Sequence, residues 1–313
     1  MSNNHLQIEI YGESHAEKIG VIIDGLPAGF RVDITELEAF LSRRAPGNSP
    51  CSTARREPDK PVFVRGLPEG VTDGGTLEAF IVNQDVRKED YEKFSTVPRP
   101  GHADYGAWLK TGKIPSGGGR WSGRMTAPLC IAGGICKQIL AAEGIEVEAE
   151  ISRLGGDIEE AKSRGDSVGG DISCRITGVK AGVGNALFDG IESEIARLAF
   201  AIPAVKGIEF GDTKDYGSEN NDAFVIEDGE VRTATNNCGG ILGGISTGMP
   251  IEFKLRFKPT PSIGIEQDSV DLETMQPAKI KIEGRHDPCI LPRALPCVEA
   301  IAAIAIYSML QNE

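Results

Sequence analysis

A degenerate internal repeat is the sequence feature that most constrains how this chain can fold. GLPAG at 25–29 follows the strand-like VIIDG and precedes the helical DITELEAFLSRR. GVKAG at 178–182 follows the strand-like DISCRIT and precedes the helical DGIESEIARLAFAI. In both copies acidic residues stand near the start of the helix, where they suit the helix dipole. A unit that recurs in this way predicts one supersecondary structure formed twice.

Three further pairs of segments recur in the same order. The Gly-rich stretch 70–82 resembles 240–253, and RPGHAD at 99–104 resembles RHDP at 285–288. RMTAPLC at 124–130 and RALPC at 293–297 each open a helix of small apolar residues. Helices that are apolar nearly all round are buried. Gly-rich loops can also look alike by chance, and that alternative stays open.

The shared order favours a duplicated unit folded about a pseudo-twofold axis. We therefore predict an α+β sandwich in which central helices lie between two antiparallel sheets. The prediction is one domain over residues 1–313, with repeats at about 11–150 and 168–310. The polar stretch 154–169 is expected to join the halves, and 264–276 to form a surface loop.

Composition narrows the partners and the compartment. The 46 acidic and 33 basic residues give a net charge of −13, which disfavours binding to nucleic acid or to an anionic membrane. The seven cysteines have irregular spacing and form no CxxC pair, as expected for reduced thiols in the cytoplasm. MSNNHLQIEIYGESH has no signal-peptide pattern. The apolar run 297–310 contains Glu299 and is expected to be too short to span a bilayer.

Three histidines lie in loop-like segments with charged neighbours. His15 is in GESHAEKIG, His102 in RPGHADYG and His286 in EGRHDPC. Histidine is the side chain suited to proton transfer near neutral pH, although a structural hydrogen-bonding role is the alternative for each. Nothing shows the ligand spacing of HExxH, so we predict no metal site.

Arginines gather beside glycines and histidines despite the acidic total. The arginines in question are Arg43, Arg44, Arg55, Arg56, Arg99, Arg120, Arg124 and Arg285. A guanidinium binds phosphate or carboxylate through a planar fork, so the pattern favours an anion pocket over solvated surface charge. SGGGRWSGRMT at 116–126 leads into the first apolar helix and is a generic phosphate or flavin signal. It matches neither the Walker A loop nor the dinucleotide fingerprint.

Taken together, the motifs resemble those of the chorismate synthase family from about residue 11 to 310. The matching blocks are GESH at 12–15, DGLPAG at 24–29, RR-x-PG at 43–47, RREPD at 55–59, RPGHADY at 99–105, GGGR-x-S-x-R-x-T at 117–126, AVKGIEFG at 204–211, GGILGGIS at 239–246, KPT-x-SI at 258–263 and GRHDPC at 284–289. Ten blocks in one order are far more specific than any one of them.

The resemblance implies a lyase that eliminates phosphate from 5-enolpyruvylshikimate 3-phosphate and gives chorismate, in the shikimate pathway of aromatic amino-acid biosynthesis. It implies reduced FMN as cofactor without net redox change, a small anionic substrate and a homotetramer. It also implies helices sandwiched between two sheets, in agreement with the duplicated pattern. Whether the chain reduces its own flavin with NADPH is left open.

The resemblance also assigns site residues. His15 resembles the acid that protonates the departing phosphate, His102 the histidine that protonates reduced flavin near N1, and Asp287 the carboxylate that works with flavin N5 in removing the ring proton. The positions that match flavin-contacting residues are Arg120, Ser122, Ala204, Gly243, Lys258, Thr260, Ser262 and Arg285. The positions expected to bind substrate are Arg43, Arg44 and Arg124.

The chain departs from the family pattern at several of these blocks. The changed positions are Ala16, Ala45, Pro50, Trp121 and Met125. Two alternatives therefore stay open: a diverged paralogue that binds FMN and another phosphorylated anion, and a catalytically silent flavin-binding subunit. Retention of His15, His102 and Asp287 favours catalysis.

Overall fold

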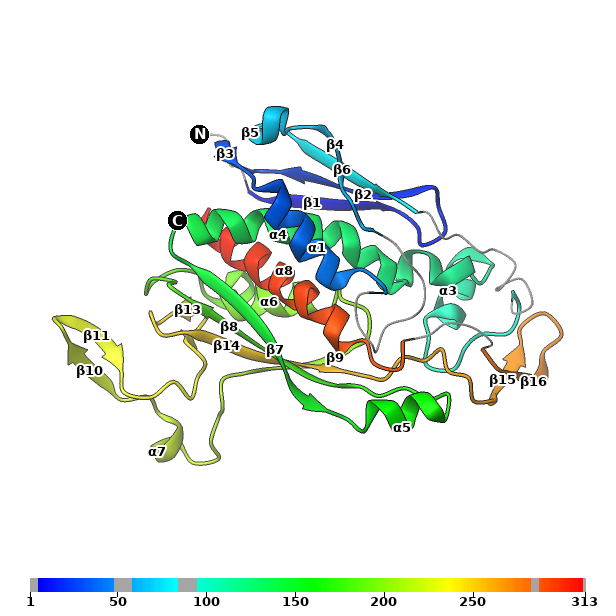
Figure 1. The fold of residues 1–313 in the computed structure, drawn as a ribbon. Helices are drawn as coiled ribbons and strands as arrows, with labels where there is room; N and C mark the ends of the chain where they lie inside the picture. The colour runs from blue at the N-terminus through cyan, green and yellow to red at the C-terminus, as the bar shows by residue number, and fades with distance from the viewer. Residues whose placement is uncertain (1–4, 48–57, 84–94, 283–286, 312–313) are drawn as a thin grey trace.

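A layer of helices lies between two four-stranded antiparallel sheets in the computed structural model, which describes residues 5–47, 58–83, 95–282 and 287–311 (Figure 1). The first sheet has the order β1-β2-β6-β4, formed by β1 (Gln7–Gly12), β2 (Lys18–Asp24), β4 (Val62–Arg65) and β6 (Leu77–Val82). The second has the order β7-β8-β14-β9, formed by β7 (Glu146–Leu154), β8 (Gly170–Thr177), β9 (Val205–Phe210) and β14 (Ile251–Phe257). The predicted α+β sandwich is confirmed.

The two sheets follow the same plan along the chain. Each unit runs through two strands, a helix, two strands and a long helix; the helices are α1 (Ile34–Arg44) and α4 (Thr126–Ala142) in the first unit, and α6 (Ile191–Ala199) and α8 (Leu291–Leu310) in the second. The GxxAG turns after β2 and β8 share a backbone requirement, because Gly25, Gly29, Gly178 and Gly182 have φ of 92°, 85°, 85° and 97°. Residues with a Cβ are strained at such angles.

The connection between the units differs from the one we expected. Because β7 belongs to the second sheet, the stretch 154–169, which contains α5 (Ile158–Ser163), connects two strands of that sheet and does not join the halves. The single-domain organisation and the repeat limits of about 11–150 and 168–310 stay predictions.

Local sequence explains where α1 begins. The side chain of Asp33 caps the helix, accepting a hydrogen bond from Glu36 N at 3.0 Å. Gln138 of α4 bonds both backbone groups of this cap, at 2.8 Å to Asp33 N and 2.9 Å to Asp33 O. The start of α1 is therefore fixed to the central helix α4.

The two central helices approach each other closely. A Cβ added at Gly133 of α4 would lie 2.8 Å from Ala300 O of α8 and still closer to its Cα, so only glycine fits there. The Cys130 and Cys297 Sγ atoms are 3.8 Å apart on the same two helices. Both contacts advance by three residues on each helix, from 130 to 133 and from 297 to 300, so the helices run in the same direction (Figure 1). Their N-termini consequently lie at the same end of the molecule, the end that carries α3 (Asp104–Thr111).

Burial, not length, identifies these helices as core elements. The segments Gly123–Ala142 and Leu291–Leu310 are both long and apolar enough to cross a membrane, but 83% and 78% of their apolar windows are buried inside the protein. The expectation that the C-terminal apolar run is too short to span a bilayer was wrong, because α8 begins at Leu291 and has 20 residues.

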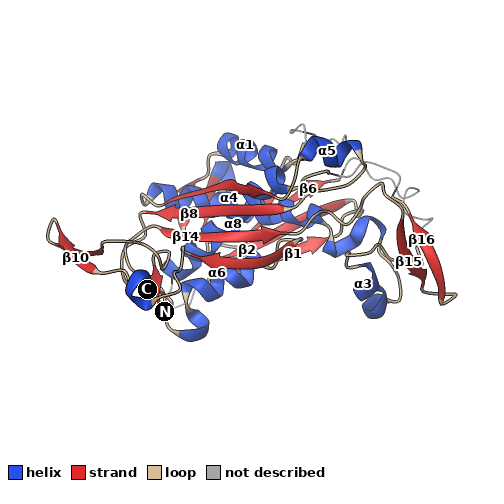
Figure 2. Cartoon of the chain, turned by 90° about the horizontal axis from the view of Figure 1, so that it is seen from below, coloured by secondary structure: helices blue, strands red, loops and turns tan. Residues whose placement is uncertain are grey.

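Smaller elements lie outside the two four-stranded sheets and the central helices. They are β3 (Ala28–Arg31), β5 (Val71–Asp73), α7 (Gly217–Asn220), β10 (Phe224–Glu227), β11 (Glu230–Thr233), β12 (Ile241–Leu242), β13 (Ile245–Ser246), β15 (Gln267–Asp271) and β16 (Gln276–Ile280). The β10–β11 hairpin projects from one end of the molecule and the β15–β16 hairpin lies at the other (Figure 2).

The β15–β16 hairpin corrects the prediction of a surface loop over 264–276. Its strands are too polar to show a strand pattern. The turn between them is set by Asp271, whose Oδ1 accepts hydrogen bonds from Glu273 N and Thr274 N at 2.9 Å each. A carboxylate that bonds backbone amides two and three residues ahead favours a tight turn.

We predict that Gly133→Ala destabilises the protein by about 1–3 kcal/mol, because the added methyl meets backbone atoms of Ala300 that cannot move aside without separating α4 from α8. Gly106→Ala is the matched control. It adds the same methyl within a helix where nothing lies within 4 Å, so stability should stay equal or rise by about 0.5–1 kcal/mol. Urea unfolding of both variants measures the difference, and equal stabilities would contradict the close approach.

Candidate active site

The Gly-rich turn before α4 brings two of the predicted catalytic histidines together. Gly117 and Gly118 have φ of 59° and 82°. A Cβ at Gly117 would lie 3.0 Å from His15 Nε2 and closer still to its Cε1 and Nδ1, and one at Gly118 would lie 3.0 Å from His102 Cε1. The two imidazoles therefore pack against consecutive glycines. The turn that the sequence marked as a generic ligand loop needs its glycines for this contact.

A buried carboxylate orients His102. Asp104, the first residue of α3, contacts His102 Nδ1 through Oδ1 at 2.6 Å. Arg99 donates to the same carboxylate from Nε at 2.7 Å and from Nη2 at 2.8 Å. Burial opposes ionisation of Asp104, but the hydrogen bonds from Arg99 and His102 outweigh it and hold the pKa of this carboxyl well below its usual range. Because Nδ1 is engaged, Nε2 is the ring nitrogen of His102 available for proton exchange.

The segment that follows β14 lies against the same loop. Lys258 Nζ donates to Gly101 O, and Arg99 Nη1 donates to Ser262 Oγ at 3.1 Å. Lys258 N also donates to Ala204 O at 3.0 Å, and Ala204 holds an unusual φ of 75°. Four of the residues predicted to contact flavin, including Thr260, thus lie next to the His102 loop.

Two hydroxyl groups in this region have unused hydrogen-bonding capacity. Thr260 Oγ1 and Ser116 Oγ are buried and have no hydrogen-bond partner among the described residues. A buried hydroxyl without a partner costs free energy, so such atoms are candidates for ligand contacts.

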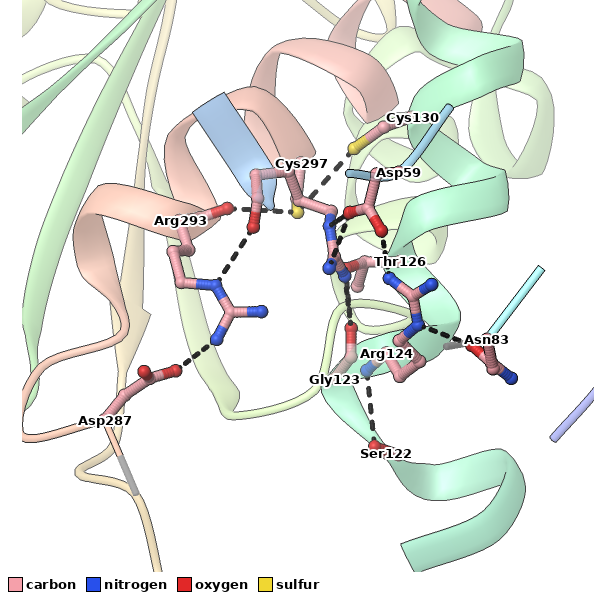
Figure 3. Close-up of polar contacts among 11 residues, drawn as sticks. Asp59, Asn83, Ser122, Gly123, Arg124, Thr126, Cys130, Asp287, Arg293 and Cys297 are labelled. Carbon is pink, nitrogen blue, oxygen red and sulfur yellow. Dashed lines mark hydrogen bonds and ion pairs between the residues drawn. The ribbon is translucent and has the colours of Figure 1, made fainter. Parts of the chain in front are cut away.

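Asp59 unites two of the predicted substrate arginines (Figure 3). Its Oδ2 accepts from Arg44 Nε at 2.9 Å, its Oδ1 accepts from Arg124 Nη1, and all three side chains are almost fully buried. Arg124 Nε also donates to Asn83 Oδ1 at 2.9 Å. Asp59 adopts a φ of 49°, a strained angle for a residue with a Cβ. The backbone is thus bent where it delivers this carboxylate between the arginines.

Asp287 joins this cluster through Arg293, a residue in the first turn of α8 (Figure 3). Arg293 Nη1 pairs with Asp287 Oδ2, and Arg293 Nε donates to Arg44 O at 3.0 Å. On its other side the Asp287 segment is held by Val168, whose N donates to Pro288 O at 2.8 Å.

Other predicted residues lie outside this cluster. Arg43 binds Glu299 of α8, with Nη2 2.6 Å from Oε1, so the structure does not bring it to Arg44 and Arg124. Gly243 lies between β12 and β13, and β13 is at the end of the molecule opposite α3 (Figure 1). Arg120 and Ser122 remain on the turn, where Arg120 Nη2 donates to Ile10 O at 3.3 Å. The predicted residues that fall outside the described part of the chain are Arg55, Arg56, Arg285 and His286.

The structure shows the surroundings of three of the five positions that depart from the family pattern. Ala45 is buried at the end of α1, and Met125 packs against the core. Trp121 is 37% exposed on the Gly-rich turn. Pro50 lies outside the described residues.

Sequence reasoning assigned no role to three residues that organise this site. Asp59 stands in the RREPD block and Asp104 in RPGHADY, but neither was given a function. Arg293 was noted only as the residue that opens the second apolar helix. An acid two residues after a histidine and at the start of a helix was an available signal for Asp104. Nothing local marks Asp59, because its partners are distant in sequence.

Comparison with known proteins gives a consistent result. The family model described as chorismate synthase matches residues 6–157 and 153–310. A relative from Lancefieldella parvula named chorismate synthase is 43% identical, and the match covers 98% of this chain and 95% of that protein. One from Thermococcus gammatolerans with the same name is 41% identical, covering 98% and 96%. A crystal structure of chorismate synthase superposes with a TM-score of 0.75 at 22% identity, covering 98% of this chain and 92% of the other.

We predict that Asp104→Asn lowers stability by about 2 kcal/mol at pH 7, because Arg99 and His102 lose a charged acceptor. The lowered pKa of Asp104 means that its ionised form contributes stability above the unfolded-state pKa of about 4, and that this contribution is lost as the pH falls further. The gap between wild type and variant should therefore narrow below about pH 4.

Urea unfolding at pH 7, 5 and 3.5 measures this gap. Asp212→Asn is the control, because Asp212 pairs with Lys214 on the surface. A gap that is independent of pH for Asp104→Asn would contradict the assigned ion pairs.

Proposed function

This chain belongs to the chorismate synthase family and is therefore a phosphate-eliminating lyase, and we propose that it performs this elimination at the site built around the Gly-rich turn 116–126. The observation that carries the proposal is the packing of His15 and His102 against consecutive glycines of that turn. Two proton carriers are thereby held beside the arginines that follow on the same turn.

The site is suited to anions although the whole chain carries −13. The α4 and α8 helices begin at the same end of the molecule, and a helix N-terminus carries partial positive charge. Arg44 and Arg124 lie together near these helix starts, and Arg293 is in the first turn of α8. Arg44 and Arg124 share the single carboxylate of Asp59, so together they keep a net positive charge, and we assign them to the anionic groups of the substrate. Arg43 pairs with Glu299 instead.

The residues also fit reduced FMN, a ligand that presents a phosphate and polar ring edges. Thr260 Oγ1 and Ser116 Oγ are buried donors with unused capacity, and Lys258 supplies a cation. We propose that FMN is held by Arg120, Ser122, Ala204, Lys258, Thr260 and Ser262. When bound, reduced FMN supplies transient electron density that assists cleavage of the C–O bond.

The acid–base roles that we propose are those that the family resemblance implies for His15, His102 and Asp287. We assign to His15 the transfer of a proton to the departing phosphate, which leaves more easily when protonated. His102 exchanges a proton at Nε2, with Nδ1 held by Asp104. Asp287 accepts the proton removed from the substrate ring.

Turnover tests the proposal directly. An anaerobic assay with 5-enolpyruvylshikimate 3-phosphate and chemically reduced FMN should release phosphate and form chorismate, followed by absorbance. Binding of FMN without turnover would favour a paralogue that acts on another phosphorylated anion. Formation of chorismate would exclude the catalytically silent flavin-binding subunit.

We predict that His15→Ala lowers kcat by about 100-fold or more while leaving FMN affinity within a few-fold, because a general acid contributes to chemistry more than to cofactor binding. Flavin fluorescence titration measures the affinity in parallel. Loss of FMN binding with an unchanged kcat at saturation would remove the acid role.

We also propose a cytoplasmic homotetramer. The β10–β11 hairpin projects with Phe224, Ile226 and Val231 exposed to solvent by 65–80% (Figure 1). Exposed apolar side chains of this size mark an association surface. β13, which follows Gly243, lies at the same end, so we propose that Gly243 approaches a flavin bound to a neighbouring copy of the chain.

Light scattering should give a mass near four times the 33.4 kDa chain mass. Ile226→Glu should shift the protein to smaller species, because a charge is placed in the apolar contact. Thr235→Glu, which adds the same charge outside the hairpin, is the control. A monomer at micromolar concentration would contradict the tetramer.

A further inference from the structure

Arg293 occupies a position that links the predicted base to the arginine cluster. One arm of its guanidinium, Nη1, pairs with Asp287 Oδ2, and Nε donates to Arg44 O at 3.0 Å (Figure 3). Arg44 is the last residue of α1, where helix carbonyls lack partners within the helix. Arg293 therefore satisfies a helix end and a carboxylate with one planar group.

From this geometry we infer that Arg293 is a positioning residue for the reaction: it holds Asp287 in place and keeps its carboxylate ionised. The inference rests on the proposed role of Asp287 as the group that accepts the ring proton. Arg293 itself is not assigned any contact with substrate or cofactor.

The charges around Asp287 single out Arg293 within the described part of the chain. Arg293 approaches it from α8. Arg44 on α1 contacts Arg293 through its backbone carbonyl, but its guanidinium pairs with Asp59. Arg124, on the Gly-rich turn, also directs its guanidinium to Asp59. These two arginines share the charge of one carboxylate, whereas Arg293 contacts Asp287 directly.

Both side chains of this ion pair are largely buried, so the loss of one strongly affects the other. The Asp287 side chain is 8% exposed and that of Arg293 is 20% exposed. Burial lowers the pKa of Arg293, an effect that the nearby Asp287 opposes, and an arginine remains charged in either case. A buried carboxylate that loses its cation is stabilised in its protonated form, so its pKa rises.

A purely structural role for Arg293 predicts something different. If Arg293 serves only to bond Arg44 O at the end of α1, its loss lowers stability and the yield of folded protein but leaves the ionisation of Asp287 unchanged. The position of the acid limb in the pH profile of kcat/KM therefore separates the two roles, because the base must be ionised to act.

Three variants make the comparison. Arg293→Gln removes the charge, and Arg293→Lys keeps it but cannot reach both Asp287 and Arg44 O with a planar fork. Lys137→Gln is the control, because Lys137 of α4 also pairs with a buried carboxylate. That carboxylate, Glu299, lies on α8 like Arg293 but outside the cluster.

We expect Arg293→Gln to move the acid limb of kcat/KM upward by about one pH unit or more and to lower kcat at least about tenfold. Arg293→Lys should keep the limb within a few tenths of a unit while kcat falls. Lys137→Gln should lose thermal stability with no change in the limb. A folded Arg293→Gln variant whose limb coincides with that of wild type would overturn the inference.

A second readout does not depend on turnover. In protein with ¹³C-labelled aspartate, the Asp287 carboxyl signal, assigned by its loss in Asp287→Asn, should titrate at higher pH in Arg293→Gln than in wild type. Unchanged titration refutes the positioning role. If the wild-type protein is inactive but the Asp287 signal still titrates at higher pH in Arg293→Gln, the proposed function is refuted. The inference that Arg293 keeps Asp287 ionised then stands.

Discussion

The close parallel approach of α4 and α8 is the constraint on which the rest of the structure depends. Gly133 against Ala300 lets the two backbones nearly touch, and each helix then covers one of the two sheets. Because the helices run in the same direction, their first turns lie at one end of the molecule. Arg124 and Arg293, which stand at those two helix starts, therefore become part of the same cluster. The helix packing that forms the core therefore also brings the residues of the site together.

Buried charge gives this cluster its fixed geometry. Asp59 is fully buried between Arg44 and Arg124, and Glu299 is buried beside Arg43 and Lys137, which are partly exposed. Desolvation offsets much of the attraction in such pairs, so their contribution to net stability is small, but removal of one partner costs about 3–5 kcal/mol. Packing arrangements that separate these charges are therefore unfavourable. The strained backbone of Asp59 fits the same interpretation, since the surrounding contacts must hold it.

Some parts of the site could be predicted because their signal is local. The run of glycines at 117–119 and the histidines in Gly- or Pro-containing segments were visible in the sequence, and the structure places Gly117 and Gly118 against His15 and His102. Arg43 and Arg44 show the limit. They are neighbours in sequence, yet a helix turns about 100° per residue, so one reaches Glu299 and the other Asp59. No periodicity reveals which arginine faces which acid. The β15–β16 hairpin was missed because its strands lack an apolar face.

The sequence by itself determined the duplicated plan, the two buried helices and the family, because these are written in repeated order, in apolar composition and in ten ordered motifs. Tertiary structure alone decided which charged groups meet. Asp59 with Arg44 and Arg124, and Glu299 with Arg43, are chosen by burial of the carboxylate, because a buried charge must find a partner. That choice depends on how α1, α4 and α8 pack. Contacts between residues 65 positions apart, as in Arg124 with Asp59, or 256 positions apart, as in Arg43 with Glu299, leave no local trace in the chain.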